Sequence, residues 1–333
     1  MRATEHSEIQ KALRNRASRA VAGLILGLGL TGVASVSLGF TTISLPGIWN
    51  DETTQLIVQM RLARFVVAAC VGASLSTAGL LMQRVLRNPL VEPGVLGLNA
   101  GAALAAAGVL LLSPGAVSQL GISVAASSGA LLVMAIVLGF GWSPGQPVSA
   151  RFILAGIALS ALCGALLTAL SLSSSPERLP QLLAWLGGDL NGMTFRQAAI
   201  MAGMATVLFA ALRPFSRSLD ALSLDTRSAA GIGIGQKMTL LPLLVAATAA
   251  GIATSVVGVV SFVGLVAPHL ARRVVGQGFI RILPCTMLIG ASLVALADLA
   301  GRLVLSPDQV PAGLITALVG APWFFIVMAR QND

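Results

Sequence analysis

Long stretches of apolar and small residues follow one another along almost the whole chain, separated by mostly short polar connections. A bilayer core about 30 Å thick requires about 20 residues of α-helix. Stretches of this length predict ten membrane-spanning segments, and they are 20–39, 62–83, 95–112, 119–140, 150–171, 195–212, 238–258, a short one at 262–273, 282–304 and 311–329. The pattern therefore predicts an all-α, polytopic membrane protein.

These segments do not show the alternation of a membrane β-strand. Val66–Leu81 and Leu288–Leu299 are apolar or small on all sides, whereas a barrel strand alternates apolar and polar positions. The short segment Ser261–Arg273 contains Pro268, and an interrupted helix at membrane depth must be covered by protein or line a cavity. We therefore expect this segment to lie inside a helical bundle.

The composition agrees with a membrane protein. Of the 333 residues, 56% are apolar and 10% are charged, whereas a soluble domain has about 45–50% and about 25%. The three cysteines, Cys70, Cys163 and Cys285, are scattered through apolar segments without the spacing of a disulfide or a metal site. We interpret them as packing residues.

The net charge of +9 follows the predicted topology. If residues 1–19 are cytoplasmic, alternating the segments places most of the other basic residues on the cytoplasmic side as well. Segment 20–39 is longer than the 7–15 apolar residues typical of a signal peptide, so we expect it to be retained. The sequence thus predicts a cytoplasmic segment at 1–19, a transmembrane domain at 20–333, and both termini in the cytoplasm.

Two connections are longer than the others, and this topology places them on opposite sides of the membrane. The outer one, Ser173–Gly192, contains an amphipathic stretch, Leu182–Leu186, that predicts a short interfacial helix. The inner one, Arg213–Lys237, predicts a turn, then a helix capped by Ser223 or Asp225, then a glycine-rich stop. Each connection is a candidate contact surface.

The sequence contains no convincing catalytic, nucleotide or metal site. Gly27–Gly32 matches the GxGxxG pattern, but it lies inside an apolar segment with no strand before it, and GxxxxGK[ST] is absent. The two histidines, His6 and His269, are far apart in the sequence. We therefore expect neither an enzyme nor a cofactor in this chain.

Four charged residues are candidates for function. Asp298 and Arg302 are four residues apart on a predicted helix and are expected to pair near its outer end, as a structural or gating ion pair; a proton relay through Asp298 is the alternative. Arg61 and Arg64 project from one side of the second segment at its outer start. They are expected either to bind acidic groups of a partner or to extend to the lipid interface.

The block RLARFVVAACVGASLSTAGLLMQRVLRNPLVEPGVLGLNAGAALAA at 61–106 is the longest of four that resemble one known family, the FecCD permeases of bacterial importers for ferric siderophores, haem and cobalamin. The other three follow in the expected order: WLGGDLNG (185–192), VVSFVGLVAPHLARRVVG (259–276) and ADLAGRLVLSPDQVPAGLITALVGAPWFF (297–325). The resemblance covers nearly all of the chain after residue 20.

The resemblance implies a type II ABC importer permease in the bacterial inner membrane. Its partners would be two ATPase subunits that bind the ATP, a periplasmic or lipoprotein binding protein outside, and a second permease subunit, identical or homologous. In the family, arginines at the positions of Arg61, Arg64 and Arg302 receive acidic residues of the binding protein. This sequence has Ala63 where the family usually has proline, so the local turn is expected to differ.

The resemblance also assigns the gates and the ATPase contact. The inner gate corresponds to Asn88, Leu90 and Ser149. The outer gate corresponds to the end of the fifth segment and the short helix after it, about Ser171–Gly188, and includes Ser171, Ser173 and Ser174. The cytoplasmic coupling helices correspond to 219–235. Within this range the candidate contact residues are Leu219, Leu222, Leu224, Asp225, Arg227 and Gly231.

The expected function is import of a ferric siderophore by alternating access, driven by the partner ATPases. Cobalamin and haem are the alternative substrates within the family. A secondary transporter that uses Asp298 as its coupling site is the alternative from another class.

Overall fold

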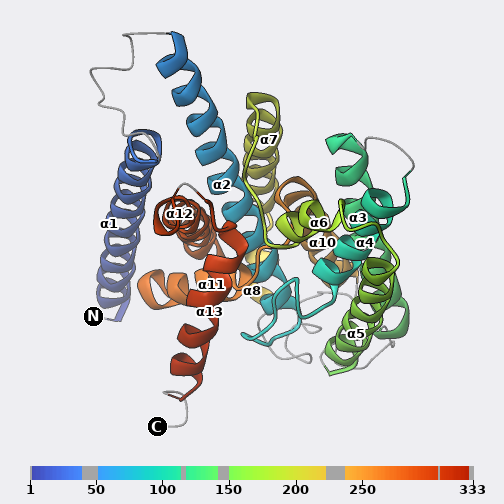
Figure 1. The fold of residues 1–333 in the computed structure, drawn as a ribbon. Helices are drawn as coiled ribbons and strands as arrows, with labels where there is room; N and C mark the ends of the chain where they lie inside the picture. Colours follow the sequence, from blue (N-terminus) through green and yellow to red (C-terminus); the bar gives the residue numbers. More distant parts are fainter. Residues whose placement is uncertain are drawn as a thin grey trace.

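The computed structural model describes residues 2–39, 52–113, 118–141, 150–222, 237–306 and 308–329, and the elements in them are α-helices (Figure 1). Their bounds are α1 Arg2–Ser37, α2 Glu52–Val85, α3 Leu98–Leu112, α4 Gln119–Gly141, α5 Ala150–Leu172, α6 Leu179–Leu186, α7 Phe195–Leu212, α8 Ser216–Ala221, α10 Lys237–Val257, α11 Val263–Val275, α12 Phe279–Val304 and α13 Ala312–Ala329.

The predicted all-α, polytopic fold is confirmed. Each of the ten predicted segments overlaps one helix. Among the described residues, seven helices are long and apolar enough to cross a membrane, and α3 and part of α13 form shorter apolar helices. The helix boundaries differ most at α1, which begins at Arg2 rather than at residue 20, and next at α2, which begins at Glu52 rather than at residue 62. In both, the more polar residues before the apolar segment continue the helix.

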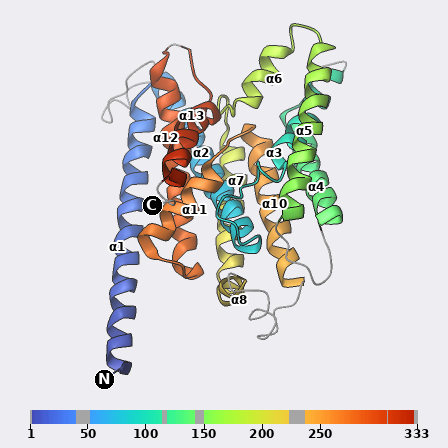
Figure 2. The same ribbon diagram turned by 90° about the horizontal axis from the view of Figure 1, so that it is seen from below.

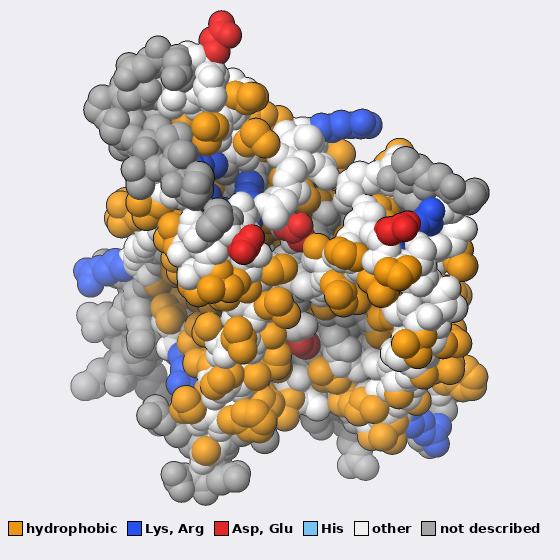
Figure 3. Space-filling model, viewed as in Figure 1, with side chains coloured by type: hydrophobic (Ala, Val, Ile, Leu, Met, Phe, Trp, Pro, Cys, Tyr) orange, Lys and Arg blue, Asp and Glu red, His pale blue; other side chains and the backbone are white. Residues whose placement is uncertain are grey.

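Apolar side chains cover most of the visible surface of the molecule (Figure 3). Leu26, Leu132 and Leu172 are among the large apolar residues with well-exposed side chains. Extensive exposed apolar surface is rare on soluble monomers, but it is what a surface in contact with lipid requires.

Helix α2 lies at the centre of the bundle and packs against α12, α10, α7 and α11. Glycines allow the closest approaches. A Cβ atom on Gly72 would lie 2.1 Å from the carbonyl oxygen of Gly290 in α12, and one on Gly79 would lie 2.0 Å from that of Gly264 in α11. Small residues at such contacts let membrane helices pack backbone to backbone.

Helices α3, α4 and α5 form a second group, which α10 joins to α2 (Figure 1). A Cβ atom on Gly101 of α3 would lie 2.7 Å from the carbonyl oxygen of Gly129 in α4. Helix α5 lies at the edge of this group and buries only Phe152, Gly156 and Cys163. The other residues of α5 are partly or well exposed.

The segment predicted to be interrupted by Pro268 is α11, which continues through this proline from Val263 to Val275, and the break in the helical course lies before it. The preceding helix, α10, ends at Val257, and two residues with positive φ, Gly258 (82°) and Phe262 (67°), lie between it and α11. The backbone N–H of Phe262 donates to Glu92 Oε1 at 3.3 Å. A carboxylate from another part of the chain therefore satisfies a donor at the start of this short helix.

The two long connections lie at opposite ends of the bundle, where α6 and α8 are found (Figure 2). Helix α6 was predicted, although it begins at Leu179 rather than Leu182. Helix α8 occupies part of the stretch in which a turn was expected, and the burial of Leu219 and Leu222 explains why this short helix is stable there. The rest of that stretch, 223–236, lies outside the described residues.

Candidate functional site

The end of the bundle that includes α6, which we call the Arg64 end, contains a cluster of charges. Arg64 of α2 reaches Asp298 of α12, with Nε 2.8 Å and Nη2 2.7 Å from Oδ1. Its Nη1 donates to Gln309 Oε1 at 2.7 Å and also to Asn191 Oδ1. The side chain of Asp298 is 1% exposed, so this carboxylate is buried.

Arg302 completes the cluster. Its Nε lies 3.3 Å from Asp298 Oδ2, a distance that allows an ion pair, although this N–H is not aligned for a hydrogen bond. Its other nitrogens donate to Ser35 of α1, to the carbonyl oxygen at 3.1 Å and to Oγ at 2.6 Å. We call Arg64, Asp298 and Arg302 the Arg64 cluster.

A pocket of about 240 Å³ opens beside the Arg64 cluster. Arg61, Arg64 and Arg302, the three predicted docking residues, all line it, so the fold brings them together. Arg61 also donates to the carbonyl oxygen of Val36 at 2.9 Å, which ties α2 to α1. Three guanidinium groups and no acidic side chain are among the described residues that line the pocket, so its lining favours an anionic partner.

The serines predicted for the outer gate lie at the same end, at and after the end of α5. Each hydroxyl donates to a carbonyl oxygen of its own chain three or four residues earlier: Ser171 to Leu167 at 2.8 Å, Ser173 to Leu170 at 3.0 Å and Ser174 to Ser171 at 2.7 Å. These hydrogen bonds join only residues between Leu167 and Ser174, and they stabilise the local turn at the end of α5.

Helix α6 is held at both of its ends. Before its start, Arg178 donates to the carbonyl oxygens of Leu110 at 3.1 Å and Leu111 at 3.3 Å, and also to that of Ser113, at the C-terminus of α3. After its last residue, the backbone packs closely on the start of α13, since a Cβ atom on Gly313 would lie 2.5 Å from the carbonyl oxygen of Gly187. The sequence contained no signal for the Arg178 contact.

The loop predicted as the inner gate follows the other end of α2, the Arg84 end. The side-chain oxygen of Asn88 accepts a hydrogen bond from the backbone N–H of Leu90 at 2.9 Å, which closes a tight turn around Pro89. Arg87 has a positive φ of 49°, and this conformation ends the helical course of the chain. Ser149, the third predicted gate residue, lies outside the described residues.

Two of the predicted ATPase-contact residues, Leu219 and Leu222, are buried at the Arg84 end. They anchor α8 and the residue that follows it. The remaining predicted contact residues lie outside the described residues, and they are Leu224, Asp225, Arg227 and Gly231. Sequence reasoning missed the ion pair beside them, in which Arg84 Nη1 lies 2.6 Å from Asp220 Oδ1.

No group of three or more His, Cys, Asp or Glu side chains in the described parts of the chain is placed to hold a metal ion. Cys70, Cys163 and Cys285 are free thiols. His269 instead packs edge-on against Trp323, with ring centroids 5.4 Å apart.

Comparison with known proteins identifies the family. The model of the FecCD transport family matches residues 24–330. The chain belongs to the FecCD transport family. Related permeases of this family cover nearly its whole length. The Fe(3+) dicitrate transport system permease protein of Escherichia coli strain K12 is 35% identical over 322 residues, which is 93% of this chain and 98% of that protein.

Other FecCD relatives have different substrates in their names. The hemin transport system permease protein of Yersinia pestis is 34% identical, covering 93% of each chain. The vitamin B12 import system permease protein of Klebsiella pneumoniae is 35% identical, covering 96% of each. A solved structure of a metal-chelate type ABC transporter in an inward-facing conformation has a TM-score of 0.82 and 30% identity, covering 94% of this chain and 99% of that one.

Membership of the FecCD family and the fold agree with each other. The chain is a multi-pass membrane permease of an ABC transport system, with the fold of a type II importer permease. A permease of such a system works with ATPase and permease partners. The resemblance expected from the four sequence blocks is thereby confirmed.

Proposed function

We propose that this FecCD permease imports a ferric siderophore by alternating access. Permeases for iron chelates are frequent among its relatives and include those for ferric citrate, ferric hydroxamate and achromobactin. Import of haem or vitamin B12 is the second candidate, because permeases for these compounds are similarly close in sequence.

One observation carries the proposed import function. A pocket with three arginines lies at the Arg64 end, and the stretch 219–235 begins at the opposite end of the same central helix. We propose that the Arg64 end faces outward and binds acidic residues of a binding protein through Arg61, Arg64 and Arg302. Both chain termini are then in the cytoplasm, on the side where basic residues are concentrated.

The Arg84 end would then face the ATPase subunits. We propose that 219–235 contacts them through Leu219, Leu222, Leu224, Asp225, Arg227 and Gly231. Asn88, Leu90 and Ser149 would close the pathway on this side, and Ser171, Ser173 and Ser174 on the outer side. Opening the two gates at different times gives alternating access.

A second permease subunit, identical or homologous, would complete the pathway. Helix α5 buries only three of its residues, and Leu154, Ile157 and Leu162 are exposed on it. A second subunit can cover part of this apolar surface and enclose a conduit between the two copies.

The substrate is tested by uptake into proteoliposomes that contain this permease with its ATPase subunits, the binding protein outside and ATP inside. Ferric siderophore, ferric citrate, haemin and cobalamin are supplied in parallel. ATP-dependent uptake of the siderophore above the other three supports the proposal, whereas preferential uptake of haemin or cobalamin assigns the second candidate function.

Docking is tested separately by the affinity of the binding protein for the reconstituted permease. Arg61→Glu reverses a charge in the pocket without removing a partner of Asp298, so we expect weaker docking and slower uptake. Arg196→Glu is the matched control, because it reverses the same charge at an exposed position at the start of α7, outside the pocket lining. Equal docking by wild type and by the double variant Arg61→Glu/Arg64→Glu would refute the docking role.

A secondary transporter that uses Asp298 is less well supported. Both oxygens of Asp298 face guanidinium groups, so this carboxylate is already engaged in two ion pairs within the protein. Uptake driven by a proton gradient in liposomes without ATPase subunits would favour this alternative.

A further inference from the structure

Asp220 connects three helices at the Arg84 end. It is the second-last residue of α8, and its Oδ1 accepts hydrogen bonds from Arg84 Nη1 at 2.6 Å and from the backbone N–H of Phe279 at 2.9 Å. Arg84 lies in the last turn of α2, and Phe279 is the first residue of α12. One carboxylate oxygen therefore joins the short helix α8 to two membrane-spanning helices. We call Arg84, Asp220 and Phe279 the Asp220 cluster.

Arg84 is a buried charge in this cluster, with a side chain that is 6% exposed, whereas Asp220 is 43% exposed. Its guanidinium lies over the ring of Phe279, 5.4 Å from the centroid, and donates to the carbonyl oxygens of Leu219 at 3.4 Å and of Gln277. A buried cation is tolerated only with such partners. Arg87 adds a second link to this region, because its Nε donates to the carbonyl oxygen of Leu222 at 3.1 Å. The region around α8 is thus fixed to α2 by two arginines.

Helices α2 and α12 are themselves held together along their length. They contact each other at Arg84 and Phe279, again at Gly72 and Gly290, and finally at Arg64 and Asp298. The rise of an α-helix places Arg64 and Arg84 about 30 Å apart. Two helices joined at both ends and packed backbone to backbone between them are expected to move as one rigid body.

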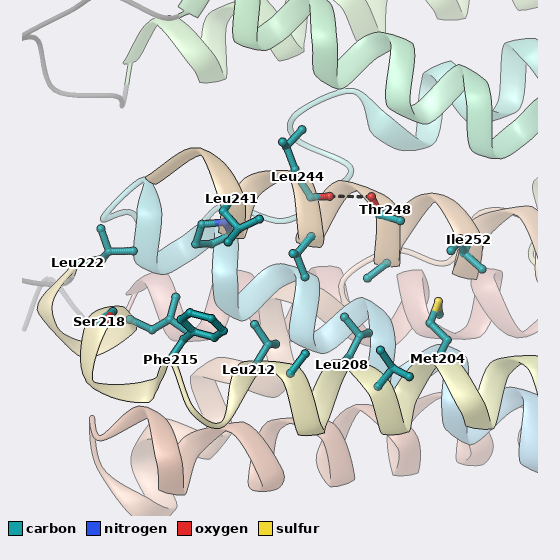
Figure 4. Close-up of a pocket in the computed structure, with 16 residues that line it drawn as sticks. Met204, Leu208, Leu212, Phe215, Ser218, Leu222, Leu241, Leu244, Thr248 and Ile252 are labelled. Atoms are coloured by element: carbon teal, nitrogen blue, oxygen red, sulfur yellow. Dashed lines mark hydrogen bonds between the residues drawn. The ribbon is translucent and has the colours of Figure 1, made fainter. Parts of the chain in front are cut away.

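The other side of α8 has looser contacts. A groove of about 500 Å³ runs between α7 and α10 and reaches α8 at one end (Figure 4). Phe215 and Leu222 line it beside α8, and Leu241 and Leu244 line it on α10. Since open space separates α8 from α10 here, a displacement of α8 acts on α2 and α12 before it acts on α10.

We propose that Asp220 is a positioning residue that transmits movement of the coupling segment to the α2–α12 pair and so to the Arg64 cluster. The inference rests on the proposed function, in which 219–235 contacts the ATPase subunits. Asp220 lies within the predicted coupling segment 219–235 but was not among its predicted contact residues, and Arg84 was not assigned to this contact. The proposal adds the connection by which ATP-driven movement reaches the docking pocket.

The test uses the complete complex of permease, ATPase subunits and binding protein in proteoliposomes. Asp220→Asn removes the charge that faces Arg84 and preserves the shape of the side chain and one acceptor for the N–H of Phe279. We expect ATP hydrolysis to continue while substrate transported per ATP falls about fivefold or more, the lower range of coupling between distant sites. Glu52→Gln is the matched control, because it neutralises an exposed carboxylate at the first residue of α2.

Asp220→Glu restores the charge and is expected to recover part of the lost coupling, which a merely structural defect would not predict. Wild-type coupling in Asp220→Asn, with normal uptake by the unmodified complex, would overturn this inference alone. If the unmodified complex shows no ATP-dependent uptake, the proposed function fails as well. If Asp220→Asn does not assemble, the amount of substrate transported per ATP is measured for Arg84→Lys instead, and this keeps the test decisive.

A distance measurement provides an independent readout. Spin labels at Leu56 of α2 and Leu172 of α5, both exposed, report movement at the Arg64 end in a background without the native cysteines. We expect ATP to change this distance in the otherwise unmodified complex and to have little effect on it in Asp220→Asn. An equal ATP-driven change in both complexes would overturn the proposal.

Discussion

Arg64 and Asp298 form an ion pair of 2.7 Å between α2 and α12, although 234 residues separate them in the sequence. Arg302 lies on the other side of the same carboxylate, at 3.3 Å. Asp298 is therefore the only negative charge in the Arg64 cluster and holds two arginines close together. The two arginines give the cluster a net positive charge, and both depend on this one carboxylate for stabilisation.

Asp298→Asn is expected to destabilise the protein strongly. The substitution leaves the buried guanidinium of Arg302 and the nearly buried one of Arg64 without an anion, and breaking a buried pair in this way costs about 3–5 kcal/mol. The effect is measured by denaturing the purified protein in detergent and monitoring unfolding through the loss of helical signal. Asp308→Asn removes an exposed carboxylate near the same end and should change stability by less than about 0.5 kcal/mol. Equal effects of the two variants would contradict the role of Asp298.

Gly72→Ala is expected to force α2 and α12 apart. The new methyl group would lie 2.1 Å from the carbonyl oxygen of Gly290, and backbone atoms cannot rotate away as a side chain can. Overpacking of this kind costs about 1–3 kcal/mol. Gly27→Ala in α1 is the control, because no atom of the described residues lies within 4 Å of its new methyl group, and helix propensity favours alanine by about 1 kcal/mol. The same denaturation assay should move in opposite directions for the two variants.

Arg178→Gln is expected to loosen the attachment of α6 to α3. The guanidinium donates to carbonyl oxygens at the C-terminus of α3, where a cation is favoured by about 0.3–1 kcal/mol and by up to about 2 kcal/mol when partly buried. Hydrogen–deuterium exchange should become faster in the last turn of α3 and in α6. Glu177→Gln changes the neighbouring exposed residue and should leave both regions as protected as in the wild type.

Glu92→Gln is expected to destabilise the start of α11. The carboxylate accepts a hydrogen bond from the backbone N–H of Phe262 at 3.3 Å, whereas an amide has one acceptor oxygen and introduces a buried N–H₂ group. An unsatisfied buried polar group costs about 1–3 kcal/mol. Limited proteolysis should reveal faster cleavage around Phe262 in this variant. Cleavage at the wild-type rate would show that α11 does not depend on Glu92.

The sequence predicted the spanning helices because the length and hydrophobicity of a segment are local properties that a bilayer reads directly. It did not predict the pairs Arg64–Asp298 and Arg84–Asp220, because these pairs join residues distant along the chain and have no signature in spacing. The turn expected around Ser218 was wrong for a related reason. Burial of Leu219 against other helices stabilises α8, and tertiary packing of this kind overrides weak local preferences.

Two separate observations on the sequence identified the candidate docking residues. The i, i+3 spacing of Arg61 and Arg64 indicated a shared side of one helix, and the family resemblance added Arg302. Their convergence on one pocket depends on how α12 crosses α2, which only the folded chain defines.

The two ion pairs of α2 also place a limit on how this helix can change. Arg64 and Arg84 are separated by 20 positions, and each contacts a fixed partner at its own end. Inserting one residue between them would rotate one end by about 100° relative to the other and shift it by about 1.5 Å, so that both arginines could no longer meet their partners. Side chains along α2 can be substituted within the space available, but the number of residues between Arg64 and Arg84 cannot change.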